Sequence, residues 1–510
     1  LSSSRRGPRL YSSSSSPSTS VPNPPSSPSP LGDLSDKVFL APMVRGSELA
    51  SRTLARHLYG PDFLCYTPML RSNEVVDAYH KVWKDRFHSD AAAVLALTAE
   101  DKLKLRDELR EDAYLTVLDT RPSDSPLVAQ LCGSDPSILS EAVEALLEIY
   151  DAMGNPLRGI DLNLGCPQEC ASDGGFGAFL AEGDPERAAE CVRAMRDAID
   201  AHGAKSLPAA AEATESGGTG RDHPGRKKPP PRLSAKIRLF DEVSDTIAFA
   251  GRLRAAGCES LTVHCRRRED KHDGAPDYGA GAEIVRALQE VQNGGEGGED
   301  DGEVRTDSGI STGGDMPVVI NGDVKTAEDA RRVLAVTGAS AVMVARGFLE
   351  NPRALLPSSP PRNAPSSLDD THTDADGNAA TMFDDPAHLA AEYLSHTERY
   401  PPPSTLYVRK HLRWIFRGKL QPAGSTRDHS KLVDYTDWRP RLWTFLNQPY
   451  LETAGQFRDV VGLYCKLSGT EAPPSLRGTV EGASFKSIRG GSRKKKKKQE
   501  RLITSPAEEC

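Results

Sequence analysis

The feature that most constrains the fold is a series of eight short apolar runs, alternating with helical patterns over roughly 320 residues. The runs are Val38–Met43, Phe63–Met69, Leu127–Gly133, Gly159–Gly165, Leu233–Phe240, Ser260–Arg266, Pro317–Gly322 and Ala341–Gly347. Eight strands that alternate with helices predict an α/β fold, the (β/α)8 TIM barrel. A doubly wound sheet is the alternative, but the glycine-containing turns suited to a phosphate come late in the chain, as they do in barrels.

Helix signals fill the gaps between these runs. Apolar residues at helical spacing follow the third run (Leu139, Val143, Leu146, Leu147, Tyr150) and the fourth (Ala188, Val192, Met195, Ile199). Asp135-Pro136 and Asp184-Pro185 each provide an N-cap followed by proline at the first helical position. Thr326 and Asp329 have the spacing of a capping box.

Composition divides the chain further. We expect a leader at 1–36, a barrel at 37–356, a linker at 357–383, a small all-α domain at 384–468 and a basic tail at 469–510. The leader, linker and tail, and two insertions at about 203–231 and 294–314, are predicted to be disordered because they lack apolar periodicity. A less clear insertion lies between Phe87 and Pro126, where Leu103, Leu105 and Leu109 suggest a short helix.

The two ends of the chain bear on location. The leader is rich in Ser, Pro and Arg and has no acidic residue before Asp33, which suits a disordered leader or an organellar transit peptide. The tail carries a run of lysines ending at Lys498, which suits nucleic-acid contact or nuclear import. We therefore expect a cytoplasmic or nuclear protein, or an organellar one in a mitochondrion or plastid.

Charge and cysteine usage exclude several classes. The net charge of −8 gives no global cationic field, so any nucleic-acid surface must be local. The nine cysteines are scattered, as in a reducing compartment, and Cys166 and Cys170 have no partners to complete a metal site. No apolar run is long enough to span a membrane, so we expect a soluble protein. We also expect a monomer.

The most informative stretch for chemistry runs from Ile160 to Pro167. Side chains alternate in a strand, so Asp161 and Asn163 should project to one side, and Cys166 follows at the strand's exit. Taken alone, such a cysteine is more often a buried thiol than a catalyst. The role of Asp161 stays open.

Polar residues also stand at nearly all of the remaining strand ends. They reverse that interpretation, because the strand ends of a barrel meet at one place and together form a site. A Gln, an Asn, a Lys and a His suit the pyrimidine rim of a flavin, and late glycine turns suit one phosphate, so we infer flavin mononucleotide (FMN). The predicted cofactor-binding residues are Ala41, Pro42, Met43, Gln130, Lys236, His264, Asn321, Gly322, Asp323, Ala345, Arg346 and Gly347. Cys166 is the predicted catalytic residue, and Asn163 and Arg266 are predicted to face the substrate.

The helical domain carries a row of cations. Arg409, Arg413 and Arg417 recur at intervals of four, with Lys410 beside them, so they share one helix face. An ordinary solvated face fits this pattern as well as an RNA-binding one.

Taken together, these stretches resemble tRNA-dihydrouridine synthases, in particular the eukaryotic branch that modifies D-loop positions 16 and 17. The matching text is Leu40-Ala-Pro-Met43, Leu64-Cys-Tyr-Thr-Pro-Met69, Val128-Ala-Gln-Leu131, Asp161-Leu-Asn-Leu-Gly-Cys-Pro167, Gly177-Ala-Phe-Leu180, Lys236-Ile-Arg238, Leu261-Thr-Val-His264 and Asn321-Gly322. Three positions depart from the family pattern: Cys265, where Gly is usual, Arg267, where Thr is common, and Arg346, where the 16/17 branch has an acidic residue.

The resemblance implies a barrel with bound FMN followed by a helical tRNA-binding domain at 384–468, with NADPH as reductant, tRNA as substrate and Cys166 as the acid. Arg409, Arg413 and Arg417 would then hold RNA phosphates. Hydride would go from flavin N5 to uracil C6, and Cys166 would protonate C5. The alternatives are an FMN barrel oxidoreductase acting on a small molecule and an RNA-binding barrel without catalysis. The cationic helical domain speaks against the first, and the retention of Cys166, Lys236 and His264 speaks against the second.

Overall fold

The computed structural model describes residues 29–110, 112–205, 230–290, 316–356, 371–373, 379–381, 385–420, 437–446, 451 and 453–476. Most of the leader, of the two expected insertions, of the linker and of the basic tail lies outside the described residues. The tail was expected to be disordered from 469, but Pro474–Leu476 form a 3₁₀ turn with Leu476 buried.

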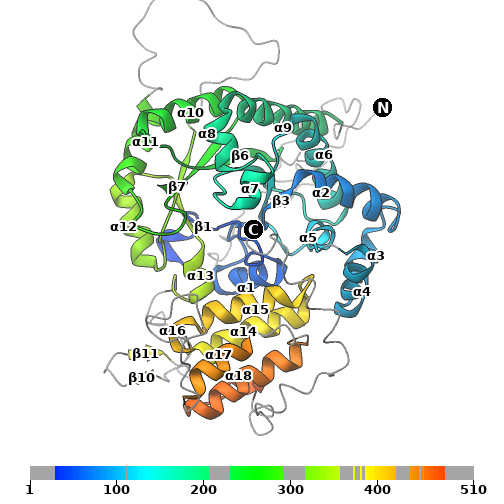
Figure 1. The fold of residues 1–510 in the computed structure, drawn as a ribbon, viewed down its shortest axis with the longest axis vertical. Helices are drawn as coiled ribbons and strands as arrows, with labels where there is room; N and C mark the ends of the chain where they lie inside the picture. The colour runs from blue at the N-terminus through cyan, green and yellow to red at the C-terminus, as the bar shows by residue number, and fades with distance from the viewer. Residues whose placement is uncertain are drawn as a thin grey trace, which may run out of the picture.

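Eight parallel strands close into a barrel with helices around it (Figure 1). The strands are β1 Val38–Leu40, β2 Cys65–Tyr66, β4 Leu127–Cys132, β5 Gly159–Leu164, β6 Arg232–Leu239, β7 Ser260–Arg267, β8 Val318–Asn321 and β9 Ala341–Val344. Each coincides with one of the eight expected runs to within one residue at its ends or lies inside it, and the β2–β4 pairing closes the ring. The TIM barrel prediction is confirmed, and the doubly wound alternative is wrong. One further strand, β3 Leu70–Arg71, pairs with β4; its two residues gave no periodic signal.

Helices surround the barrel, and three of them, α6, α9 and α12, begin where caps were expected. They include α1 Leu49–Tyr59, α2 Ser72–Asp77, α6 Pro136–Ala152, α7 Glu169–Asp173, α8 Ala178–Gly183, α9 Pro185–Lys205, α10 Val243–Ala255, α11 Tyr278–Glu290, α12 Ala327–Thr337 and α13 Arg346–Glu350. The Asp135 carboxylate accepts from the N–H groups of Ser137 and Ile138, and Thr326 and Asp329 form the expected capping box. A π-helix, Ala78–Lys84, extends α2.

The barrel interior is filled by side chains below the mouth. Ala41, Tyr66, Val128, Val319, Ala341 and Met343 form this inner cluster, while the outward strand residues join the larger core beneath the helices. Because side chains alternate along a strand, the next inward positions toward the carboxyl ends face the open mouth.

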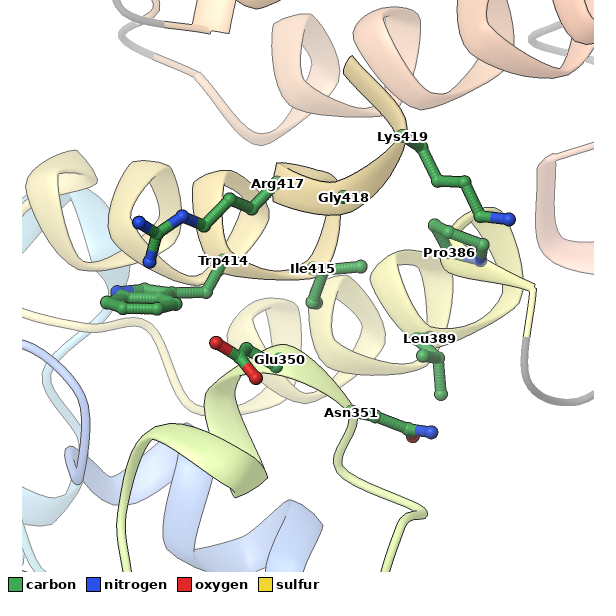
Figure 2. Close-up of a pocket in the computed structure, with 9 residues that line it drawn as sticks. All are labelled: Glu350, Asn351, Pro386, Leu389, Trp414, Ile415, Arg417, Gly418 and Lys419. Carbon is green, nitrogen blue, oxygen red and sulfur yellow. The ribbon is translucent and has the colours of Figure 1, made fainter. Parts of the chain in front are cut away.

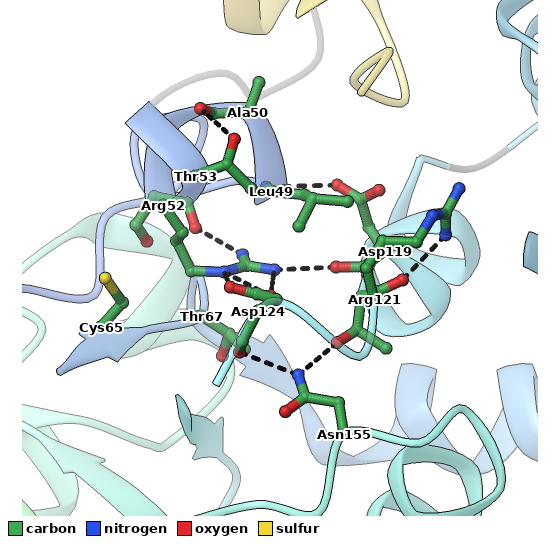
Figure 3. A network of polar contacts seen from close by, with 12 residues as sticks. Leu49, Ala50, Arg52, Thr53, Cys65, Thr67, Asp119, Arg121, Asp124 and Asn155 are labelled. Carbon is green, nitrogen blue, oxygen red and sulfur yellow. Dashed lines mark hydrogen bonds and ion pairs between the residues drawn. The ribbon is translucent and has the colours of Figure 1, made fainter. Parts of the chain in front are cut away.

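The insertion after Phe87 is helical. It forms α3 Ala91–Leu95, α4 Ala99–Leu109 and α5 Ala113–Leu118, so the short helix expected around Leu105 is present. Behind it, the 119–126 segment is tied to α1 by a buried ionic network (Figure 3). The Arg52 guanidinium donates to the Asp124 carboxylate at 2.5 Å and to the carbonyls of Ser47 and Asp119 at 2.7 and 2.8 Å. Arg56 also pairs with Asp124.

The helical domain comprises α14 Pro386–Arg399, α15 Thr405–Ile415, α16 Arg417–Leu420, α17 Trp438–Leu446 and α18 Ala454–Ser468. It lies against α1 on one side of the barrel (Figure 1). Buried polar contacts fix this position: the Glu48 carboxylate accepts from the Tyr393 hydroxyl at 2.7 Å and pairs with His411 at 3.1 Å. Lys102 donates to the Pro401 carbonyl at 2.8 Å.

Three expected boundaries shift. A 3₁₀ turn, Gly32–Leu34, packs with Leu31 and Leu34 buried, so ordered structure begins before Lys37. Helix α9 continues to Lys205. Strands β10 Thr371–Thr373 and β11 Ala379–Thr381 pair within the expected linker.

Across the described part of the chain, the helices are too short or too polar to cross a membrane.

Candidate active site

The polar strand-end residues meet at one end of the barrel. Strand register places Gln130 beside Asp161, Asn163 beside Lys236, Arg238 beside His264, and His264 beside Asn321. These residues come from neighbouring strands and share the inward parity of each strand. The expected convergence of strand ends is therefore present in the structure.

Asn163 positions the loop that carries Cys166. Its Oδ1 accepts from the backbone N–H groups of Gly165 at 3.1 Å and Cys166 at 3.0 Å. Its Nδ2 donates to Gln130 Oε1 at 2.9 Å and lies 3.2 Å from Met69 Sδ. Both ends of the amide are thus engaged by the protein, so Asn163 orients the Cys166 loop, whereas the sequence suggested a direct substrate contact.

Asp161 anchors this arrangement from below. Its carboxylate accepts from Gln130 Nε2 at 2.7 Å and from Ser234 Oγ at 2.6 Å, and it is fully buried. Burial raises the pKa of Asp161 to about 6, although the two hydrogen bonds and Lys236 oppose that rise. Gln130, predicted to bind the cofactor, is itself 1% exposed and held between Asp161 and Asn163. The open role of Asp161 is therefore that of a brace.

Cys166 lies half-buried at the exit of β5. Its carbonyl accepts from the Ala178 N–H at 3.1 Å, which ties the loop to the start of α8. Burial raises the pKa of the Cys166 thiol, while Arg238, Lys236 and Arg71 oppose the rise. The thiol is therefore protonated at neutral pH, as an acid must be.

Gly177 lies directly against Cys166. It has a φ of 66°, and a Cβ there would lie 2.8 Å from the Cys166 carbonyl oxygen and 3.0 Å from its Cβ. A Gly177→Ala variant should therefore displace the thiol, since an L residue is strained at this φ and has no room. If the chain has the activity that the sequence resemblance implies, dihydrouridine yield in a tRNA assay should fall at least tenfold with flavin still bound; a wild-type yield would contradict this. Gly183→Ala, where a Cβ meets nothing within 4 Å, is the matched control.

Two cations from β6 line the mouth beside this loop. Arg238 donates to three backbone carbonyls, of Gly165 at 2.8 Å, Arg267 at 2.9 Å and Lys271 at 2.7 Å. Burial lowers the pKa of Arg238 to about 10 and that of Lys236 to about 8, with Arg238 adding to the second effect. Within the described residues no hydrogen bond or ion pair engages the Lys236 ammonium. A half-buried cation without a hydrogen-bonded partner is costly unless a ligand supplies one.

His264 and Arg266 on β7 differ in their charge and in the number of groups that their side chains contact. Burial, then Lys236 and the nearby arginines, hold the pKa of His264 well below its usual range, so its ring is neutral. Arg266 was predicted to face the substrate, but its side chain is 1% exposed and paired with Asp323. It also donates to the carbonyls of Asp273 and Gly274, so it braces the β7–α11 loop.

The β8 and β9 ends complete the mouth. Asp323, with a φ of 45°, links Arg266 to Arg346, whose Nη2 lies 2.9 Å from Asp323 Oδ1. Arg346 remains 33% exposed and can still reach an anion. Asn321 Nδ2 donates to the Met343 carbonyl at 2.9 Å, and Gly322, with a φ of 137°, accepts from Tyr278. Ala345 and Gly347 flank Arg346 at the start of α13, Ala41 belongs to the inner cluster, and Pro42 and Met43 are half-buried above it.

The sequence reasoning missed several residues that matter here. Arg238 was noted at a strand end but not assigned, although its spacing of two from Lys236 places both on the inward face. His272, in the β7–α11 loop, lies 6.5 Å from His264 between ring centroids, and no periodicity indicates it. Cys265, the departure from the family pattern, faces outward and is buried, so it stays clear of the mouth.

The three arginines predicted to share one helix face are divided between two helices, because α15 ends at Ile415 and Arg417 begins α16. Their side chains are only partly free. Arg409 is half-buried and donates to the Leu451 carbonyl at 3.4 Å, whereas Arg413 and Arg417 are exposed over the rings of Trp443 and Trp414. Figure 2 shows a cavity of about 450 Å³ between the ends of α13 and α15 and the start of α14. Arg417 is the one predicted site residue in its lining, so this cavity is separate from the barrel mouth.

The mouth suits a flavin phosphate ester by the chemistry of its side chains. The unpartnered Lys236, the neutral His264 and the exposed part of Arg346 offer donors to an anionic, hydrogen-bonding ligand. No group of three or more His, Cys, Asp and Glu side chains in the described ranges could hold a metal ion.

Comparisons with known proteins agree with these observations. A family model described as "Dihydrouridine synthase (Dus)" matches residues 39–207, 226–295 and 309–434. The chain is 30% identical over 391 residues to the rat tRNA-dihydrouridine(16/17) synthase [NAD(P)(+)]-like, covering 76% of this chain and 62% of that protein. It is 28% identical over 330 residues to the Schizosaccharomyces pombe tRNA-dihydrouridine(16/17) synthase [NAD(P)(+)], covering 64% and 58%.

A third relative belongs to another branch: the human tRNA-dihydrouridine(20a/20b) synthase [NAD(P)+]-like is 27% identical over 312 residues, covering 61% of this chain and 68% of that protein. The chain spans less than two thirds of the rat and mouse proteins it matches, 62% and 57%.

Proposed function

The chain belongs to the dihydrouridine synthase family, and on that premise we propose that it reduces the C5=C6 bond of uridine in tRNA to give 5,6-dihydrouridine. The observation that carries the proposal is the Cys166 thiol, held by Asn163 and Gly177 beside the unpartnered Lys236. We propose D-loop positions 16 and 17 as the targets, in line with the names of the rat and yeast relatives.

The proposed cofactors are FMN and NADPH. When bound, FMN reduced by NADPH would supply the hydride that adds to uracil C6. Lys236, His264 and Arg346 would hold it: Lys236 has no hydrogen-bond partner among the described residues, Arg346 is 33% exposed, and His264, whose Nε2 lies 3.3 Å from Arg266 Nη1, would offer its Nδ1. Asp161 and Asn163 would act indirectly, because both hold the side chain of Gln130 by hydrogen bonds.

Cys166 supplies the proton in this proposal. Its Sγ–H bond breaks as a C5–H bond forms on the uracil, and the thiolate left behind is reprotonated from water. The raised pKa keeps Sγ protonated before the step, and the nearby charges of Arg238 and Lys236 stabilise the thiolate after it. Because Asn163 holds the Cys166 N–H, the thiol keeps one orientation through the cycle.

The target base must leave the folded RNA to reach a barrel mouth. Arg413 and Arg417, exposed on the helical domain, are the proposed contacts for RNA phosphates, with Arg409 contributing less because it is half-buried. We also propose that the protein works as a monomer in the cytoplasm, nucleus or an organelle.

Mapping dihydrouridine in an unmodified tRNA transcript tests this function. The purified protein with FMN and NADPH should convert U16 and U17, and tRNA from cells lacking the protein should lose dihydrouridine there. Conversion at other positions would overturn the positional assignment. NADPH oxidation driven by a small enone, with no product in tRNA, would instead favour the small-molecule alternative.

Replacing Lys236 tests the cofactor site. Lys236→Met should lose most of its flavin absorbance on purification, because the cation facing the flavin is removed. In the wild type, Lys236 gives up its proton as pH rises through about 8, so the Kd for FMN should rise above pH 8, by up to about tenfold per pH unit. Lys37→Met, exposed at the opposite end of β1, should retain flavin; equal retention in both variants would exclude Lys236 from the site.

A further inference from the structure

The inserted helices α3, α4 and α5 reach from the barrel to the helical domain. On the barrel side, Val94, Val117 and Leu118 are buried in the main core. On the other side, α4 and α5 each carry a polar side chain, Lys102 and Thr116, that contacts the helical domain. In Figure 1 these helices lie beside the barrel, next to α15. The insertion therefore connects the two parts of the molecule.

Lys102 on α4 joins three segments at once. Its Nζ donates to the Pro401 carbonyl at 2.8 Å, between α14 and α15, and to Asp119 Oδ1 at 2.9 Å. The other carboxylate oxygen of Asp119 accepts from the Leu49 N–H at 3.4 Å, at the start of α1. The Lys102 and Asp119 side chains are 5% and 3% exposed, so water scarcely weakens these charge-assisted bonds.

Thr116 on α5 makes a second contact with the helical domain. Its Oγ1 and the Tyr407 hydroxyl of α15 lie 3.0 Å apart. Tyr407 is 4% exposed, and burial raises the pKa of its hydroxyl, which therefore keeps its proton. The helical domain is thus held from two directions, by Glu48 at the start of α1 and by the inserted helices.

Support from two directions fixes an angle as well as a position. A domain attached at one place can rotate about that contact, whereas a second contact at a distance from the first prevents the rotation. On the proposed function, the helical domain holds the folded RNA and the barrel receives the target base. The angle between them then determines which nucleotide reaches Cys166, and a small rotation exchanges one nucleotide for its neighbour.

We propose that the inserted helices determine positional specificity: Lys102 and Thr116 hold the helical domain at the angle that brings one D-loop position to Cys166. This inference rests on the proposed function, because it concerns the choice among uridines of the same substrate. Lys102 and Thr116 are positioning residues, since they act through Pro401 and Tyr407 rather than through the RNA.

The test uses tRNA transcripts that carry a single D-loop uridine, moved one position at a time. The rate of dihydrouridine formation at the best position, divided by the rate at the next best, measures the selectivity. Thr116→Val and Tyr407→Phe remove the same hydrogen bond, so each should lower this ratio about fivefold, a typical contribution of one hydrogen bond. The double variant should lower the ratio no further. Lys102→Met removes two bonds and should lower it more.

Thr397→Val is the matched control. Thr397 is also a buried threonine, and its Oγ1 donates to the Leu394 carbonyl at 2.8 Å within α14. This variant loses a buried hydrogen bond but no contact between the two parts, so the wild-type ratio should persist even where the melting temperature falls. An equal loss of selectivity in Thr397→Val and Thr116→Val would assign the effect to stability and overturn the inference.

The remaining outcomes separate this inference from the proposed function. A wild-type ratio in both Thr116→Val and Tyr407→Phe, or equal rates at all positions in the wild-type protein, would overturn the inference and leave the proposed function standing. A wild-type protein that forms no dihydrouridine in any transcript would overturn both. Should Lys102→Met fail to fold, the Thr116 and Tyr407 variants decide.

Discussion

A Cys166→Ala variant is expected to form dihydrouridine about 10²- to 10⁴-fold more slowly than the wild type, the usual contribution of a positioned general acid. Flavin binding should persist, because the Asn163 contacts to the loop use backbone N–H groups that alanine keeps. Flavin reduction by NADPH should also persist, since it needs no proton from this thiol. Single-turnover formation of dihydrouridine in a tRNA transcript, set beside the rate of flavin bleaching, separates the two half-reactions.

Two further variants sharpen that result. Cys166→Ser keeps a hydroxyl in the same place but is a far weaker acid, so it should be nearly as slow as alanine. Cys191→Ala removes a buried thiol of α9, whose pKa burial raises to about 12, and should leave the rate unchanged. Wild-type yield from Cys166→Ala would remove this thiol from the mechanism.

Asp124→Ala is expected to lower the free energy of unfolding by about 3–5 kcal/mol, the cost of leaving a buried charge unpaired. Asp124 is 0% exposed and pairs with Arg52 (Figure 3). It also pairs with Arg56, and both arginines are buried. With Asp124 gone, two guanidinium groups would lie beneath α1 without a carboxylate. Urea denaturation at pH 7, followed by circular dichroism, measures the change.

The surface pair Asp33–Arg331 provides the contrast. Both side chains are more than half exposed, so Asp33→Ala should leave the urea midpoint nearly unchanged. If Asp124→Ala shifts the midpoint no more than Asp33→Ala does, the buried network is not a main support of α1. Because α1 carries the helical domain, a large shift should also weaken tRNA binding.

The fold followed from local patterns in the sequence. Alternating apolar runs placed all eight barrel strands, because buried parallel strands need continuous Val, Leu and Ile, and the caps at Asp135 and Thr326 placed helix starts. The two-residue strand β3 and the turn at Gly32–Leu34 escaped prediction because tertiary contacts, and no repeating pattern, hold them.

The site was predictable as a set of positions but less so as a set of roles. Lys236, His264 and Asn163 could be placed at one mouth because alternate residues of each strand face inward, and this alternation can be read from the sequence. Whether a polar group is available to a ligand depends on which partners it finds. The Asn163 amide is hydrogen-bonded to backbone N–H groups, and the Arg266 guanidinium is bonded to backbone carbonyls and to Asp323. The spacing of residues in the sequence does not reveal such contacts.

The buried contact of Glu48 with Tyr393 and His411 has a consequence for how a substrate is chosen. It ties the helical domain to Glu48, the N-cap residue of α1, only a few positions after the loop at the mouth. On the proposed function, the distance between the arginines that hold RNA phosphates, Arg413 and Arg417, and the Cys166 thiol is therefore fixed. Such an enzyme would select the nucleotide that lies at this fixed distance along the folded RNA, independently of the sequence of the neighbouring bases.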